Sequence, residues 1–178
     1  MSHAVKQVEN FIVKCSATSG CAPVAVDVIE EFVAYYDKES LERQLLEMED
    51  ALINNADNKV EIVQGLFRDM HSLKGSSGLL KIDVMTHLLH NLEDVLGAIS
   101  NNVLNISAVK RTDIFDFFLQ GFDLIEKLVQ IFQQDPTFVL KNSREKFGFY
   151  IRIIVEARSI VENIDQYMEF TEMDENVF

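Results

Sequence analysis

The stretch at residues 59–100, KVEIVQGLFRDMHSLKGSSGLLKIDVMTHLLHNLEDVLGAIS, decides the fold of this chain. Its first half carries a seam with steps of three and four residues, the spacing of a helix in a bundle, at Val63, Leu66, Met70, Leu73, Ser77 and Leu80. Its second half carries a similar seam at Met85, Leu88, Leu92, Val95 and Ile99. Only residues 81–83 connect the two, so we expect antiparallel neighbouring helices at 59–80 and 83–100.

The rest of the chain is also expected to be helical, because no stretch alternates cleanly with period two. Both prolines, Pro23 and Pro136, fall in apparent breaks. Further helices are expected at 4–15, at 24–54 with a bend near residue 37, at 107–134 and at 143–170. Asn58 and Asp83 are N-cap candidates.

The segment FGFYIRIIV at residues 147–155 is rich in β-formers, yet its wider pattern favours a helix. Apolar residues recur at helical spacing from Phe147 to Met168. The sequence therefore predicts an all-α fold, an antiparallel four-helix up-down bundle with an additional C-terminal helix. We expect a short helix and linker at 1–25, a single domain at 26–172 and an acidic tail at 173–178.

The composition of the chain argues against several classes of function. The net charge of −13 argues against nucleic acid, whose binding depends on Lys and Arg, and against an anionic membrane surface. No apolar run reaches the ~20 residues that span a bilayer, and the N-terminus lacks the apolar stretch of a signal peptide. Two cysteines, Cys15 and Cys21, build neither a disulfide framework nor a zinc knuckle. We expect a soluble cytoplasmic monomer.

The predicted helix around His71 contains glycines, which are unusual in the interior of a helix. His71 lies off the apolar seam, and Lys74, Gly75 and Gly78 share its face at i+3, i+4 and i+7. Each interior glycine costs roughly 0.5–1 kcal/mol relative to alanine. The two glycines could allow a neighbouring helix to pack closely. We favour a second explanation, that they leave space for a partner protein to approach the imidazole of His71.

The next helix supplies matching polar residues. In an antiparallel hairpin the index sum of facing residues is constant, and the pairs His71/Glu93 and Lys74/His90 have the same sum. The seam pairs Leu73/Leu92 and Met70/Val95 share a sum that differs from it by one. A single register therefore joins the seams and brings the four polar residues to one flank.

These residue types suit phosphoryl chemistry. A neutral imidazole nitrogen is a good nucleophile towards an acyl phosphate. A carboxylate such as Glu93 on the other ring nitrogen fixes the tautomer, and a cation such as Lys74 balances developing phosphoryl charge. His90 could complete the hydrogen-bond network.

The stretch FRDMHSLKGSSG at residues 67–78 resembles the signature of histidine-containing phosphotransfer (HPt) domains. The closest similarity is to the N-terminal phosphotransfer domain of chemotaxis-type histidine kinases, where Lys and then Gly follow the phosphorylated His. A second His and a Glu there form an HxxE motif on the following helix, which His90 and Glu93 match in spacing and order. The similarity extends from about residue 27 to at least 134.

The resemblance implies a carrier and not an enzyme with its own ATP site. His71 would take a phosphoryl group from a histidine kinase or a receiver Asp and pass it to a response-regulator receiver, with Lys74, His90 and Glu93 in support. No cofactor or metal is implied, because receivers bring their own Mg²⁺. The chain departs from the family at Lys81, where members commonly have a Gly that ends the helix.

Three alternatives remain. The chain could be the phosphoacceptor domain of a larger chemotaxis-type kinase, phosphorylated in trans by its ATP-binding domain. A metal enzyme could use His87, His90 and Glu93, but this order reverses the Glu-x-x-His motif of di-iron bundles. A bundle used only for docking would not need the intact polar set.

Overall fold

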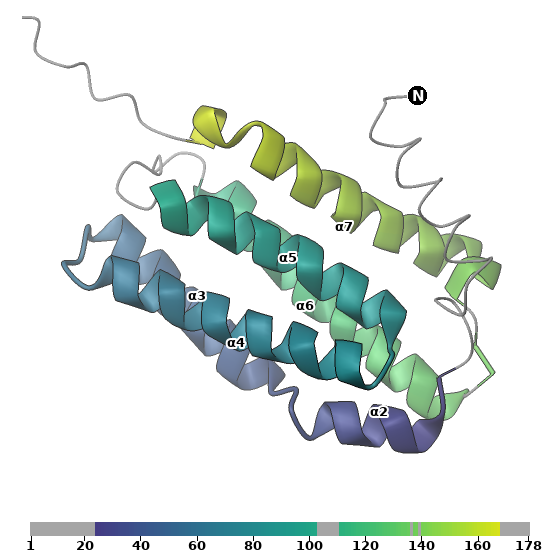
Figure 1. Ribbon diagram of the computed structural model, residues 1–178. Coiled ribbons are helices and arrows are strands. Elements are labelled where there is room, and N and C mark those ends of the chain that lie inside the picture. The colour runs from purple at the N-terminus through teal and green to yellow at the C-terminus, as the bar shows by residue number, and fades with distance from the viewer. Residues whose placement is uncertain (1–23, 103–110, 136, 139, 168–178) are drawn as a thin grey trace, which may run out of the picture.

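The computed structural model describes residues 24–102, 111–135, 137–138 and 140–167, and these contain helices and no strand, as predicted (Figure 1). The α-helices are α2 (Val26–Val33), α3 (Lys38–Ile53), α4 (Lys59–Leu79), α5 (Asp83–Asn102), α6 (Arg111–Gln134) and α7 (Arg144–Glu162). Two short 3₁₀ helices follow α6 and α7, namely η3 (Leu140–Asn142) and η4 (Ile164–Tyr167). In this part of the chain, no helix has both the length and the apolar character that a bilayer crossing requires.

The four helices α3 to α6 form the predicted up-down bundle, each antiparallel to its neighbour in the ring (Figure 1). The extra helix α7 packs on α5 and α6, and α2 packs on α6. Phenylalanines fill much of the interior, which agrees with their abundance in the sequence; those without solvent exposure are Phe32, Phe117, Phe118 and Phe122. The segment at 147–155 is helical within α7, which confirms the reading of its spacing.

The two predicted seams meet in the core between α4 and α5. Every position of the α5 seam is fully buried, and the α4 seam is buried from Val63 to Ser77. Ser77 is the one polar seam residue, and its hydroxyl lies 3.0 Å from that of Thr86 on α5. The hairpin therefore has the register that its apolar pattern predicted, and this register positions the polar flank.

Helix ends differ from the predictions in three places. The helix expected at 24–54 with a bend near residue 37 is interrupted at that point into α2 and α3, and the carboxylate of Asp37 caps α3 by accepting from the N–H of Ser40. Asp83 is the first residue of α5, so it is not the cap. The last helix ends at Glu162 instead of 170. Asn58 occupies its N-cap position without a side-chain bond. The expected helix at 4–15, the start at 107 and the tail at 173–178 lie outside the described residues.

A Schellman turn ends α4 and aims the chain into α5. The N–H of Ile82 donates to the carbonyl of Ser77, and the N–H of Lys81 donates to that of Gly78. Lys81 takes a left-handed φ of 57° at the position where glycine is usual. The departure from the family pattern thus leaves the helix end in place, at a conformational cost to Lys81.

Candidate functional site

The centre of the site is a hydrogen bond between α4 and α5. The Nδ1 atom of His71 lies 2.7 Å from Oε1 of Glu93. The side chain of His71 is 63% exposed, whereas that of Glu93 is only 8% exposed. The carboxylate is therefore buried beneath an imidazole that faces solvent, and the predicted pairing of these two residues is formed.

Lys74 reaches the same carboxylate from the turn of α4 that follows His71. Its ammonium forms an ion pair with Oε2 of Glu93, so each carboxylate oxygen has a partner of its own. Burial alone would raise the pKa of Glu93, but the hydrogen bonds and charges of Lys74 and His71 outweigh it and lower the pKa. Glu93 is therefore anionic at neutral pH.

An ionised Glu93 determines the tautomer of His71. Since a carboxylate only accepts hydrogen bonds, Nδ1 must carry the proton and donate it to Oε1. In the neutral ring the other nitrogen, Nε2, then holds a lone pair. The arrangement presents a nucleophilic nitrogen on an exposed side chain, with a buried anion behind it to stabilise any positive charge that the ring develops.

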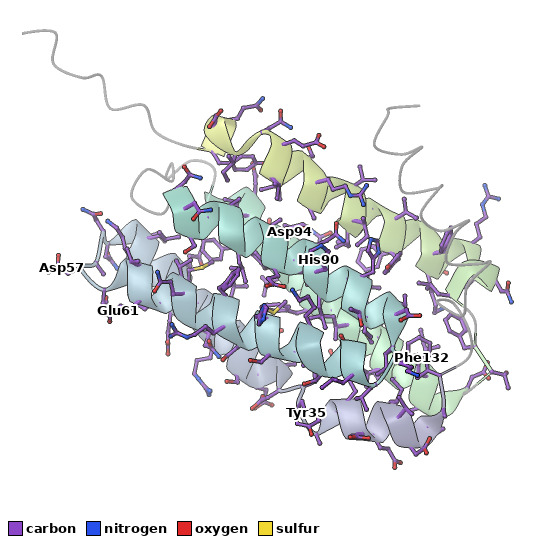
Figure 2. All side chains as sticks on the ribbon, viewed as in Figure 1. Tyr35, Asp57, Glu61, His90, Asp94 and Phe132 are labelled. Carbon is purple, nitrogen blue, oxygen red and sulfur yellow. The ribbon has the colours of Figure 1, made fainter. Side chains whose placement is uncertain are left out.

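His90 does not join this pair in the way the sequence suggested. We expected Lys74 to face His90, but Lys74 pairs with Glu93, while Nδ1 of His90 lies 3.7 Å from Asp94 one turn along α5. Figure 2 shows His90 and Asp94 close together on α5. His90 is thus exposed on the helix that holds Glu93, with its own carboxylate partner.

The two glycines beside His71 are both exposed but differ in their surroundings. A side chain at Gly75 would meet nothing within 4 Å, which agrees with the clearance explanation. A side chain at Gly78 would meet Thr86 of α5 at 3.8 Å, an ordinary contact distance. Neither glycine is required by close helix packing, so both leave open surface next to the imidazole.

Phe67 is part of the site, and sequence reasoning gave it no role. Its ring stacks on that of His71 with centroids 6.3 Å apart and an interplanar angle of 20°. Gly97 of α5 lies behind it, where an added Cβ would stand 3.6 Å from the Phe67 ring. The signal was available, because Phe67 is one helical turn before His71 and Gly97 is one turn after Glu93.

A metal centre finds no support in this region. Among the described residues, no group of three His, Cys, Asp or Glu side chains is placed to hold a metal ion. His87, one member of the metal set considered from the sequence, instead packs between α5 and α7, with Nδ1 at 2.6 Å from the hydroxyl of Tyr150.

Comparisons with known proteins agree with this geometry. The family model of the Hpt domain matches residues 38–135, which span α3 to α6. The Sensor histidine kinase CheAY of Helicobacter pylori is 32% identical over 105 residues, covering 58% of this chain and 12% of that protein. The Chemotaxis protein CheA of Borreliella burgdorferi is 27% identical over 125 residues, covering 70% and 13%.

A further relative, the Chemotaxis protein CheA of Bacillus subtilis, is 32% identical over 79 residues, covering 44% of this chain and 11% of that protein. The chain therefore spans roughly an eighth of the length of these curated relatives. No solved structure matches the chain.

Proposed function

This chain belongs to the Hpt domain family, and we propose that its own role is to carry a phosphoryl group on His71 between a donor protein and the receiver domain of a response regulator. The observation that carries the proposal is the exposed imidazole held from beneath by buried Glu93. This geometry leaves one ring nitrogen, Nε2, as the acceptor.

The transfer step balances without a cofactor in this chain. Nε2 attacks the phosphorus of an aspartyl phosphate on a receiver, or of ATP bound to a kinase. An N–P bond forms while the P–O bond breaks, and the carboxylate or ADP leaves. The phosphorylated ring keeps its Nδ1 proton, whose hydrogen bond to Glu93 stabilises the developing imidazolium.

Lys74 has a supporting role in this proposal. Its ammonium neutralises Glu93, so the site does not present a bare anion to an incoming phosphoryl group. It also lies within one helical turn of His71, where a cation stabilises phosphoryl charge. Its pairing with Glu93 supports both effects. We assign His90 a place in the outer part of the same flank.

The partners follow from the family. Proteins that present a receiver aspartate or a kinase ATP site supply and remove the phosphoryl group, and exposed Gly75 and Gly78 give them access. We propose that the chain has no ATP site of its own, binds neither nucleic acid nor membrane, and acts as a cytoplasmic monomer through one domain at 26–172.

A second role is favoured by the relatives themselves, which are named kinases and chemotaxis proteins and are about eight times longer. In this alternative the chain is the phosphoacceptor part of a larger chemotaxis-type kinase and is phosphorylated in trans by the ATP-binding domain. Both roles use the same His71 chemistry and differ only in the donor.

The experiment is a phosphoryl-transfer profile. The purified chain is incubated with each receiver domain of the host, pre-phosphorylated with labelled acetyl phosphate, and separately with each histidine kinase and labelled ATP. We expect label on the wild-type chain from at least one donor and no label on His71→Gln.

His90→Gln is the matched control, because it removes an exposed histidine on the neighbouring helix. It should still accept label. A wild-type chain that no donor labels, or a His71→Gln chain that is labelled like the wild type, would refute the proposal. Label that comes only from the ATP-binding domain of a chemotaxis-type kinase favours the second role.

A further inference from the structure

The hydrogen bond from His71 to Glu93 fixes one edge of the imidazole but leaves the tilt of the ring open. Nδ1 of His71 lies 2.7 Å from Oε1 of Glu93, and the side chain of His71 is 63% exposed. A torsion that ends in an sp² ring, such as χ2 of histidine, has broad energy wells. The ring can therefore rock about this one bond unless a second contact fixes its plane.

Phe67 supplies a contact to the face of the imidazole. The ring centroids of Phe67 and His71 are 6.3 Å apart and their planes differ by 20°, within the offset-stacked range that aromatic pairs favour. Helix geometry explains the contact, because a helical side chain leans towards the preceding turn and Phe67 lies one turn before His71 on α4. The Phe67 side chain is half-buried and packs against the core, so it is itself held in place.

Gly97 faces Phe67 from α5. Phe67 and Gly97 have the same index sum as His71 and Glu93, so they are the facing pair one helical turn further along the hairpin. An added Cβ at Gly97 would stand 3.6 Å from Cε2 of Phe67, an ordinary van der Waals distance. A longer side chain at position 97 would compete with the Phe67 ring for space.

We propose that Phe67 is a positioning residue for phosphoryl transfer. Its ring fixes the plane of the His71 imidazole while Glu93 fixes the tautomer, so that the lone pair on Nε2 keeps one direction. A reacting nitrogen with a fixed direction loses less orientational freedom in the transition state. The inference rests on the proposed function of His71, and Phe67 acts only through the imidazole.

The first test needs no phosphoryl donor and uses NMR of the full chain with labelled histidine. We expect cross-relaxation between ring protons of Phe67 and His71, and restricted motion of the His71 ring in ¹³C relaxation. Phe67→Leu should make the ring more mobile but should keep the Nδ1 proton, because Glu93 is unchanged. Phe67→Tyr keeps the aromatic face and should keep the ring ordered.

The second test measures the reaction of His71 with phosphoramidate, a small donor that needs no protein docking surface. Nε2 attacks the phosphorus, the P–N bond of the protonated donor breaks, and ammonia leaves as the new N–P bond forms. Phe67→Leu should slow this reaction about threefold to tenfold, which corresponds to the free energy of one aromatic pair. Phe67→Tyr should restore the wild-type rate.

Phe149→Leu is the matched control, because it makes the same replacement at another half-buried phenylalanine. The Phe149 ring lies on α7, with the side chains of Lys127 and Arg152 over it. This variant should change neither the order of the His71 ring nor the rate.

A second pair of variants acts on Phe67 from α5. Gly97→Leu should displace the Phe67 ring and reproduce the effect of Phe67→Leu. Gly97→Ala should have no effect, since its added carbon fits at 3.6 Å. Both replacements introduce good helix formers, so α5 should remain folded.

Several results would overturn the role of Phe67. The His71 ring could be as ordered in Phe67→Leu as in the wild type, or the rate could be unchanged although the ring is mobile. Phe149→Leu could slow the reaction as much as Phe67→Leu. Loss of the Nδ1 proton in Phe67→Leu would show that Phe67 only holds the site together. A wild-type chain that phosphoramidate never labels at His71 would overturn the proposed function and this role with it, whereas a labelled wild type with an equally fast Phe67→Leu variant would overturn the role alone.

Discussion

At Glu93, burial and neighbouring charges act on one carboxyl group in opposite directions. Burial favours the protonated form, whereas His71 and Lys74 favour the anion and prevail, so the pKa is lowered. The anion in turn accepts the Nδ1 proton of His71 and leaves the lone pair of the neutral ring on Nε2. The chemistry proposed for the exposed His71 thus depends on Glu93, whose side chain is buried.

Replacement Glu93→Gln tests this dependence. The amide has the size of the carboxylate, but it lacks the charge and can donate as well as accept, so either tautomer of His71 becomes possible. We expect the rate of phosphoryl acceptance to fall on the order of tenfold to a hundredfold. Single-turnover transfer from a labelled receiver measures it. An unchanged rate in a folded variant would show that Glu93 does not activate His71.

Sequence reasoning succeeded and failed at this site for physical reasons. The contact of His71 with Glu93 follows from helical periodicity and hairpin register, which fix where backbone positions lie. The partner of Lys74 could not be predicted from the backbone register. A long flexible side chain moves to the nearest compensating charge and not to the residue opposite it. Lys74 therefore pairs with Glu93 instead of His90.

At the scale of elements, helix ends were the least predictable features. The sequence predicts a bend near residue 37, but the chain breaks completely there, between α2 and α3. Contacts with α6 stabilise the residues at this break. The hydroxyl of Tyr36 donates to the carbonyl of Phe122. Lys38 forms ion pairs with Asp123 and Glu126. Local sequence carries no sign of partners more than 80 residues away.

The end of α4 offers a stability prediction. Lys81 has φ 57°, a conformation that costs a residue with a Cβ roughly 1 kcal/mol and glycine much less. Lys81→Gly should therefore raise the free energy of unfolding by about 0.5–1 kcal/mol, measured by urea denaturation. Asn55, with φ 51° after α3, is the internal comparison, because asparagine tolerates this region; Asn55→Gly should change stability less. A destabilised Lys81→Gly would contradict this account.

On the scale of the whole molecule, α7 completes the core although it lies beyond the residues that the family model matches. Its buried face packs on α5 and α6. Where α5 and α7 meet, the hydroxyl of Tyr150 lies 2.6 Å from Nδ1 of His87. The helix was predictable from its seven-residue spacing, but this polar contact joins residues 63 positions apart and was not.

The contact between α5 and α7 makes stability depend on pH. Burial, together with the charges of Arg158 and His90, lowers the pKa of His87 from 6.5 to about 4. The unfolded chain therefore binds a proton that the folded chain excludes, and stability falls as pH decreases from 6.5 towards 4. The loss attributable to His87 is up to about 3 kcal/mol.

Urea denaturation at a series of pH values between 7 and 4.5 measures this loss. His87→Gln keeps an acceptor for Tyr150 but cannot take up a proton, so the variant should show a flatter pH dependence. An equally steep decline in the variant would assign the effect to other groups.

We propose that Nε2 of His71 is the phosphorylated atom while Nδ1 stays hydrogen-bonded to Glu93. The most direct measurement is nitrogen and phosphorus NMR of the chain after phosphorylation, with ¹⁵N-labelled histidine. We expect one phosphoramidate, with its phosphorus coupled to Nε2 of His71 and the Nδ1 proton retained. A phosphorus coupled to Nδ1 of His71, or to either nitrogen of His90, would contradict it.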